Sequence, residues 1–204
     1  MVDTYKYLGL IMSSDLSWSK HIDSICSKAK RLLGILYRRF SEHSSSDTLF
    51  KLYLSLVRPH LEYASAVWSP YKVGEIQMIE GVQKLALKIC RKAWDQSYES
   101  LLELFQAPSL EQRRLYFDLC TMFKIVHSLC YFPPDIIRQH HATRATRATS
   151  NRPEHLYFAY PSFHTNQFQN SFIIRSIEAW NSLPLDLLSC SLSSFKLNVW
   201  SQLN

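Results

Sequence analysis

The segment from Trp18 to Phe40, WSKHIDSICSKAKRLLGILYRRF, has the clearest periodic pattern in the chain. When successive residues are placed 100° apart around a helix, its apolar side chains fall within an arc of about 140°. The residues of this arc are Trp18, Ile22, Ile25, Cys26, Ala29, Leu32, Leu33, Leu36, Tyr37 and Phe40. The segment therefore predicts a long amphipathic helix whose apolar face packs against other helices.

The opposite side of this predicted helix is basic. Around the helix, Lys20, Arg31 and Arg38 lie within about 20° of one another, with two serines between them. The six cations of the segment, called the basic ridge below, are Lys20, Lys28, Lys30, Arg31, Arg38 and Arg39. Asp23 is the one anion between Lys20 and Arg39, so this window has a net charge of +5, against +6 for the whole chain. The positive charge of the protein is thus concentrated on one predicted helix.

Length and composition indicate a folded protein. With 204 residues, 47% of them apolar and 13% aromatic, the chain can bury a core in one or two domains. Its four glycines lie too far apart in sequence to frame a phosphate-binding loop of the Walker or Rossmann type. A pI of about 9.1 favours an acidic partner such as nucleic acid, although a modest basic excess is also common on solvated surfaces.

The cysteines and the N-terminal residues indicate an intracellular location. Five scattered cysteines, several of them on predicted apolar helix faces, are typical of small core residues in a reducing environment. The chain does not begin with a basic leader and a long apolar stretch, and it has no run of about 18 apolar residues. We therefore expect an intracellular protein, nuclear or cytoplasmic, with no signal peptide, transmembrane segment or membrane partner.

The first 130 residues predict one strand and several helices. Residues 4–12, TYKYLGLIM, predict a strand, and because the chain has no earlier strand we expect the partner of this one to lie outside these residues. Helical patterns follow over 47–57, with a kink or restart at Arg58-Pro59, and then up to Trp68, over 75–94 and over 98–105. Ser109-Leu-Glu-Gln112 is a capping box that opens a helix to about residue 129.

The character of the sequence changes at Tyr131. Residues 131–156 contain Pro133-Pro134 and are poor in large apolar side chains, which is typical of a linker. Aromatic residues return after it, and two short helices are predicted over 172–183 and 193–203. We therefore predict an N-terminal segment over 1–16, a helical domain over 17–130, a linker over 131–156 and a small aromatic-rich unit over 157–204.

No catalytic or metal-binding pattern is visible in the sequence. The neighbouring soft ligands lack the paired spacing of a zinc site; they are Cys120, His127, Cys130, His140 and His141. The candidate aspartates stand alone and are interpreted as helix caps or solvated residues; they are Asp15, Asp23, Asp47 and Asp118. There is no nucleophile elbow. We expect no metal and no cofactor in this chain.

The basic ridge has three interpretations at this point. A run of charges is usually a solvated helix face. A basic amphipathic helix also binds anionic membranes, but only with its apolar face exposed, whereas here other amphipathic helices are predicted to cover it. Thirdly, Lys and Arg in a line along a helix can follow the phosphates of a duplex, with serine hydroxyls adding hydrogen bonds.

Four blocks of the sequence resemble one protein family, in the family's own order. They are YKYLGLIMSSDLSWSKHI, LYLSLVRPHLEYASAVWSP with ALKICR, PSLEQRRLYFDLCTMFKIVH, and FIIRSIEAWNSLPLDLLSCSLSSFKLNVW. The first two resemble the segment that follows the catalytic palm in reverse transcriptases of non-LTR (LINE-type, jockey or CR1-like) retrotransposons. The last two resemble C-terminal stretches of the same proteins, so the resemblance covers nearly the whole chain outside residues 140–155.

This resemblance implies a fold and a set of binding residues. The expected fold is mainly α, with a thumb-like helical bundle after a short β-strand or hairpin remnant and before a small irregular C-terminal helical unit. Tyr7, Leu8 and Gly9 match the hairpin that grips the primer terminus, whose partner strand is expected in the absent palm. The basic ridge, Lys20, Lys28, Lys30, Arg31, Arg38 and Arg39, is expected to face the phosphates of an RNA/DNA template-primer duplex.

The departures from the family limit what the resemblance implies. The motifs that carry the metal-binding aspartates, including the F/Y-A-D-D turn, are absent from these residues. We therefore expect no polymerase activity from this chain alone, since the family's Mg²⁺ is held in the palm. The chain is interpreted as the C-terminal fragment of an RNA-directed DNA polymerase that works with palm and fingers domains. Two alternatives stay open: a non-enzymatic helical protein-interaction module that uses the aromatic-rich unit, and a remnant without function. The oligomeric state is not indicated.

Overall fold

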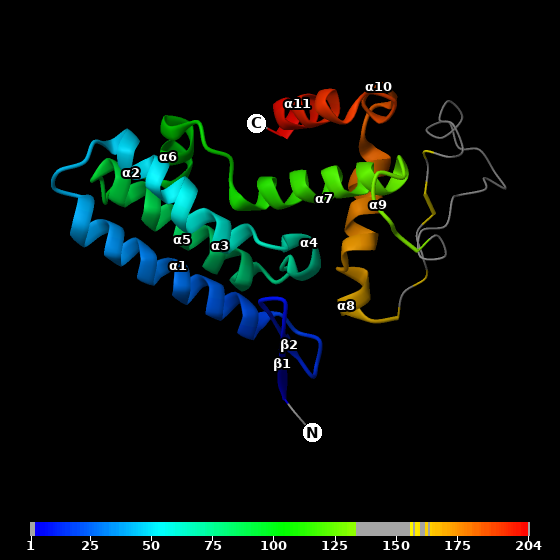
Figure 1. The fold of residues 1–204 in the computed structure, drawn as a ribbon, viewed down its shortest axis with the longest axis horizontal. Helices are drawn as coiled ribbons and strands as arrows, with labels where there is room; N and C mark the ends of the chain where they lie inside the picture. The colour runs from blue at the N-terminus through cyan, green and yellow to red at the C-terminus, as the bar shows by residue number, and fades with distance from the viewer. Residues whose placement is uncertain (1–2, 134–155, 157, 160–161, 163, 204) are drawn as a thin grey trace. The chain divides into compact units, whose positions relative to one another are not determined.

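The computed structural model describes residues 3–133, 156, 158–159, 162 and 164–203. The chain is mainly helical, with a short two-stranded antiparallel hairpin near its N-terminus, which confirms the expected fold class (Figure 1). It divides into two compact units, Met1–Arg113 and Arg114–Asn204, which are described separately below.

The N-terminal hairpin consists of β1 (Thr4–Tyr7) and β2 (Leu10–Ser13), paired antiparallel with Tyr7 opposite Leu10. The prediction of one strand over 4–12, with its partner outside the chain, is therefore wrong. Leu8 and Gly9 both have positive φ, 47° and 86°, which is the backbone of the tight two-residue turns that fit the twist of a hairpin. These two residues reverse the chain, so the segment pairs with itself.

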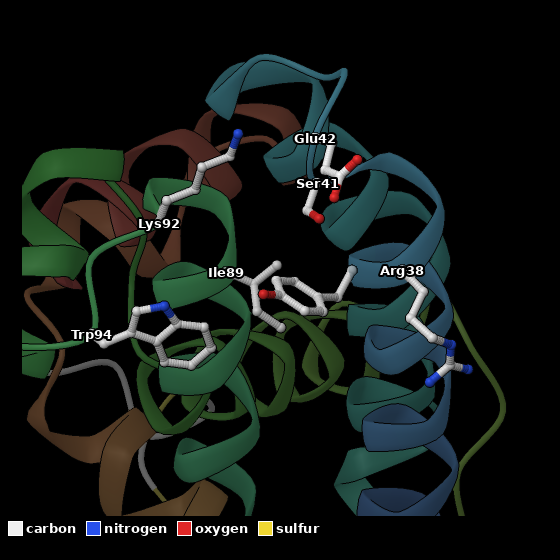
Figure 2. Close-up of a pocket in the computed structure, with 7 residues that line it drawn as sticks. Arg38, Ser41, Glu42, Ile89, Lys92 and Trp94 are labelled. Atoms are coloured by element: carbon white, nitrogen blue, oxygen red, sulfur yellow. The ribbon is translucent and has the colours of Figure 1, made fainter.

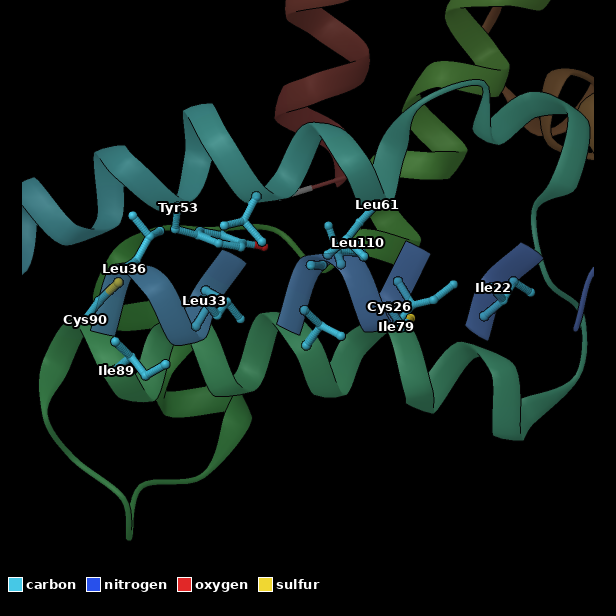
Figure 3. Close-up of a cluster of buried hydrophobic side chains, with 14 of the residues drawn as sticks. Ile22, Cys26, Leu33, Leu36, Tyr53, Leu61, Ile79, Ile89, Cys90 and Leu110 are labelled. Atoms are coloured by element: carbon cyan, nitrogen blue, oxygen red, sulfur yellow. The ribbon is translucent and has the colours of Figure 1, made fainter. Parts of the chain in front are cut away.

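The long helix predicted at the centre of the first unit is present as α1 (Ser19–Phe40). It packs against α5 (Val73–Arg91) and against α3 (Arg58–Glu62). Figure 3 shows the apolar side chains of α1 between α5 and the helical run that contains α3. The buried residues that α1 contributes to this core are Ile22, Cys26, Ala29, Leu33 and Leu36. The predicted apolar face of the helix is thus its buried face.

The expected irregularity at Arg58-Pro59 takes the form of a π-helix. The run consists of α2 (Ser46–Leu52), the π-helical turn η1 (Tyr53–Val57) and α3, so the chain stays helical through the proline. The amide of Arg58 donates to the carbonyl of Tyr53, five residues back. Pro59 has no amide hydrogen and its ring would clash with the carbonyl four residues earlier in a regular helix, which the wider turn avoids.

The helical spacing predicted up to Trp68 is interrupted. α3 ends at Glu62, Ala64 adopts a left-handed φ of 53°, and a short helix α4 (Ser65–Trp68) follows. The indole Nε1 of Trp68 donates to the carbonyl of Tyr63 at 2.7 Å, and the Trp68 side chain is fully buried. This contact compensates for the lost helical bonding at the break.

The capping box is confirmed at the start of α7 (Leu110–Val126), which follows α6 (Tyr98–Phe105). The amide of Gln112 donates to Ser109 Oγ at 3.1 Å, and the amide of Ser109 donates to Gln112 Oε1 at 2.8 Å. Both hydrogen bonds satisfy amides that the first turn of a helix leaves without partners. Leu110 is buried in the core of the first unit, so α7 begins there and continues into the second unit.

The second unit is built around aromatic side chains. Besides α7 it contains α8 (Asn166–Gln169), α9 (Phe172–Ser182), α10 (Leu185–Leu188) and α11 (Leu192–Leu203). Its core residues include Leu119, Phe123, Ile177, Trp180 and Phe195.

The division between the units falls earlier than the predicted linker. The sequence places the boundary after residue 130, whereas the structure groups 114–130 with the C-terminal residues. The reason is that Leu119 and Phe123 of α7 belong to the core of the second unit. Most of the predicted linker, 134–155, lies outside the described residues. Among the helices that the structure describes, none has the length and apolar character needed to cross a membrane.

Candidate nucleic-acid interface

All six cations of the basic ridge are exposed on α1. Within the described part of the chain, none of the six forms an ion pair, since the carboxylates that do so pair with other cations. At 1.5 Å per residue, the line from Lys20 to Arg38 is about 27 Å long. The ridge is therefore a set of solvated positive charges along most of one helix, in which Lys20, Arg31 and Arg38 form a line.

Gly34 shapes the C-terminal part of the ridge. A Cβ atom at this position would lie 3.4 Å from Nη1 of Arg38, so the guanidinium of Arg38 folds back over the backbone one turn earlier. Near the middle of the ridge, Lys28 faces α3. The pKa of His60 on α3 is lowered by burial and by the positive charge of Lys28.

The predicted hairpin residues are also exposed. Tyr7 and Leu8 have 56% and 71% of their surface accessible, and the ring of Tyr7 stacks on that of Tyr5 with centroids 6.5 Å apart. The hydroxyl of Tyr63 donates to the carbonyl of Leu8 at 3.1 Å, and a Cβ on Gly9 would lie 3.5 Å from the same ring. Tyr63 therefore holds the turn at a fixed position on the first unit.

His21 joins the hairpin to the start of α1. Its Nδ1 accepts the amide hydrogen of Ile11 at 3.4 Å, and its ring lies edge-on to Trp68 at 5.2 Å. Burial lowers the pKa of His21, because the charged imidazolium would lose its hydration. The neutral ring is thus the form that keeps the turn residues near the Lys20 end of α1.

A pocket at the other end of α1 was not predicted from the sequence. It has a volume of about 430 Å³ and lies between the C-terminal ends of α1 and α5 (Figure 2). Its lining residues are Tyr37, Arg38, Ser41, Glu42, Ile89, Lys92 and Trp94. Sequence patterns indicate each helix separately, but they do not show that residues more than 50 positions apart meet at the two helix ends.

The isolated aspartates behave differently from one another. Asp15 accepts the amide of Ser17 at 3.0 Å, and Asp47 pairs with Lys51 at 2.7 Å on the surface. Asp118 contradicts the expectation of a cap or a solvated residue, since it is buried and pairs with Arg175 at 2.6 Å. It lies on the side of α7 that faces α9, which single-helix periodicity does not reveal.

Within the residues that the structure describes, no three His, Cys, Asp or Glu side chains come together as a metal site. His140 and His141 lie outside those residues. Cys26, Cys90 and Cys120 are buried, as expected for core residues, whereas Cys130 is exposed. The described aromatic side chains of the second unit are mostly part of its core rather than a contact surface.

Comparison with known proteins found no matching family model, no matching curated protein and no matching solved structure.

Proposed function

We propose that this chain is the C-terminal part of a retrotransposon RNA-directed DNA polymerase, in which it holds the template-primer duplex through the basic ridge of α1. The observation that carries the proposal is that all six cations of α1 are exposed and have no carboxylate partner in the described part of the chain, with Lys20, Arg31 and Arg38 in line along the helix. The four sequence blocks add the resemblance to this class of polymerase.

The physical basis of the proposed binding is the release of counterions. A duplex keeps a condensed layer of cations, and each Lys or Arg that contacts a phosphate displaces part of it. The interaction is independent of sequence, which suits a polymerase that has to hold every template. In this proposal the reaction itself, and the Mg²⁺ that supports it, belong to a palm domain outside this chain.

The first test compares two triple variants of the full chain. Replacing Lys20, Arg31 and Arg38 by Gln removes the line of charge while leaving the buried face of α1 intact. The matched control replaces Lys51, Lys84 and Lys196 by Gln, which removes the same charge from exposed positions outside α1. Affinity for an RNA/DNA hybrid is measured by fluorescence anisotropy over a range of salt concentrations, with circular dichroism to check helix content.

We expect the ridge variant to bind more than about tenfold more weakly at low salt. Its slope of log K against log salt should fall by about 2 to 3, because each phosphate contact contributes about 0.9 to the slope for B-DNA and slightly less for single strands. The control variant should change the slope by much less. Equal affinity and equal slope in the two variants would contradict the proposal.

A second candidate is a protein-interaction module, favoured by the exposed apolar side chains of the hairpin, Tyr5, Tyr7 and Leu8. The two functions respond differently to salt. An apolar protein contact survives at high ionic strength, whereas phosphate binding is screened. A complex from cell extract that persists in high salt and contains no nucleic acid would support this second candidate.

A further inference from the structure

We propose that the pocket between the ends of α1 and α5 binds the base of an unpaired nucleotide, with the adjoining phosphate on Lys92. This inference rests on the proposed function in taking nucleic acid as the ligand. It adds a second, separate site, specific for single-stranded nucleotides at the Arg38 end of the basic ridge.

The walls of the pocket suit a flat aromatic ligand. Tyr37 and Trp94 are 45% and 53% exposed, and their rings meet edge to face with centroids 6.4 Å apart. Ile89, which is buried, adds an aliphatic side chain to the lining. Exposed aromatic faces of this kind stack on nucleic-acid bases, and every base has such a face. The volume of about 430 Å³ lies within the usual range for small-ligand sites.

The backbone fixes Trp94 in this position. α5 ends at Arg91, and Lys92 adopts a left-handed φ of 58° that turns the chain towards α1. The amide of Ala93 donates back to the carbonyl of Lys88 at 3.3 Å, and the Lys88 ammonium donates to the carbonyl of Trp94. Because the indole is already held next to Tyr37, little ordering is left to oppose binding.

The two cations that line the pocket, Lys92 and Arg38, have different roles in this proposal. In Figure 2 the side chain of Lys92 extends from the end of α5 above Ile89 and Trp94, whereas the guanidinium of Arg38 points away from these residues. Lys92 is thus placed to meet a phosphate of a nucleotide in the pocket, and Arg38 stays with the ridge. Glu42 is the acidic residue among the described lining residues. Its carboxylate disfavours a phosphate on its own side and can accept hydrogen bonds from base amino groups.

The test uses three versions of one RNA/DNA hybrid: blunt, with a short single-stranded overhang, and with the same overhang made of abasic sugars. A short single-stranded oligonucleotide is the fourth probe. Because one stacked base contributes about 1–3 kcal/mol, the full chain should bind the overhang hybrid at least about fivefold more tightly than the blunt one. The abasic overhang should give little of this gain, since it keeps the phosphates and lacks the base.

Variants of the pocket residues test whether the affinity gained from the overhang comes from this pocket. Trp94→Ala should abolish the overhang gain and leave affinity for the blunt hybrid unchanged, and Trp94→Phe should restore most of the gain. Lys92→Gln should reduce the gain only in part. Tyr71→Ala, which removes an exposed aromatic ring just before α5 begins, is the matched control and should change nothing.

The inference is overturned if the abasic overhang gives the same gain, if the overhang gives none, or if Trp94→Ala keeps it. The proposed function can fail separately. If the ridge variant leaves blunt-hybrid affinity unchanged while the single-stranded oligonucleotide still binds in a Trp94-dependent way, the ridge proposal is wrong and the pocket proposal holds. Absence of binding to all four probes overturns both.

Discussion

His21 shows how one side chain ties the hairpin to the helix. The imidazole is buried beside Trp18 and Trp68 and accepts the amide hydrogen of Ile11 in its neutral form. Burial lowers its pKa below 6.5, so in the folded protein the ring stays neutral at a pH where the unfolded chain takes up a proton. The stability that depends on the neutral ring is therefore present above pH 6.5 and is lost as the pH falls below it.

The first prediction follows from this pKa. We expect His21→Gln, whose side-chain oxygen can accept the same hydrogen bond without titrating, to weaken the loss of stability as the pH falls below 6.5. One proton accounts for at most about 1.4 kcal/mol per pH unit. The measurement is the urea midpoint at several pH values. His43→Gln, at an exposed position, is the control; the same pH dependence in both variants would show that His21 is not responsible.

At the scale of elements, Glu80 fixes the start of α7 from a neighbouring helix. This carboxylate on α5 accepts the amide hydrogens of Leu110 at 3.1 Å and of Glu111 at 2.8 Å, and the hydroxyl of Tyr98 at 2.5 Å. A negative charge here also complements the positive end of the helix dipole. The same hydroxyl accepts from the amide of Gln83, which links α5 and α6.

We predict that Glu80→Ala lowers the free energy of unfolding by about 2–4 kcal/mol, because hydrogen bonds to a charged group contribute about 1.5–3 kcal/mol each and do not add fully. Glu103→Ala, at an exposed position on α6, is expected to change it by less than about 0.5 kcal/mol. Chemical denaturation measures both. A loss for Glu80→Ala no larger than that for Glu103→Ala would mean that the capping set adds nothing to stability.

At the scale of the whole molecule, each unit has its own core, and the second contains a buried ion pair. Asp118 accepts from Nε of Arg175 at 2.6 Å, and the same guanidinium donates to the carbonyl of Asn170 at 3.0 Å. Burial raises the pKa of Asp118, and the hydrogen bond and charge of Arg175 oppose this rise. The pair joins α7 to α9 inside the second unit.

The third prediction concerns this pair. Asp118→Ala leaves a partly buried guanidinium without its carboxylate, which typically costs about 3–5 kcal/mol. We expect hydrogen exchange to speed up in residues 114–126 and in α9 and to stay slow in α1 and α5, because those helices belong to the other core. Asp186→Ala, at an exposed position on α10, should leave exchange unchanged. Equal acceleration in α1 would show that the two units unfold together.

Much of the helical architecture could be predicted from local patterns. The apolar arc of Trp18–Phe40 identified the buried face of α1, and the capping box identified the start of α7 within one residue. The pairing of the hairpin with itself was missed, because the turn at Leu8-Gly9 depends on a left-handed leucine, a conformation that leucine rarely adopts. The π-helix at Tyr53–Val57 was anticipated only as an irregularity near Pro59.

Of the two candidate sites, one could be predicted from local sequence patterns and the other could not. The ridge could be predicted because all its cations lie on one helix, and their spacing in sequence fixes their direction around the axis. The pocket could not be predicted from the sequence. Tyr37 and Trp94 lie 57 positions apart and meet only where α1 and α5 end side by side. The burial of Asp118 escaped prediction for a similar reason, since its partner Arg175 is supplied by another helix.

By itself, then, the sequence determined which faces of its helices are apolar, where the positive charge is concentrated and where α7 begins, because helical periodicity and capping are properties of neighbouring residues. Only the tertiary structure decided that the hairpin closes on itself, that 114–130 belong with the C-terminal residues, and that two aromatic rings border a pocket. Those features depend on contacts between distant segments, and such contacts are set by how the apolar faces pack together.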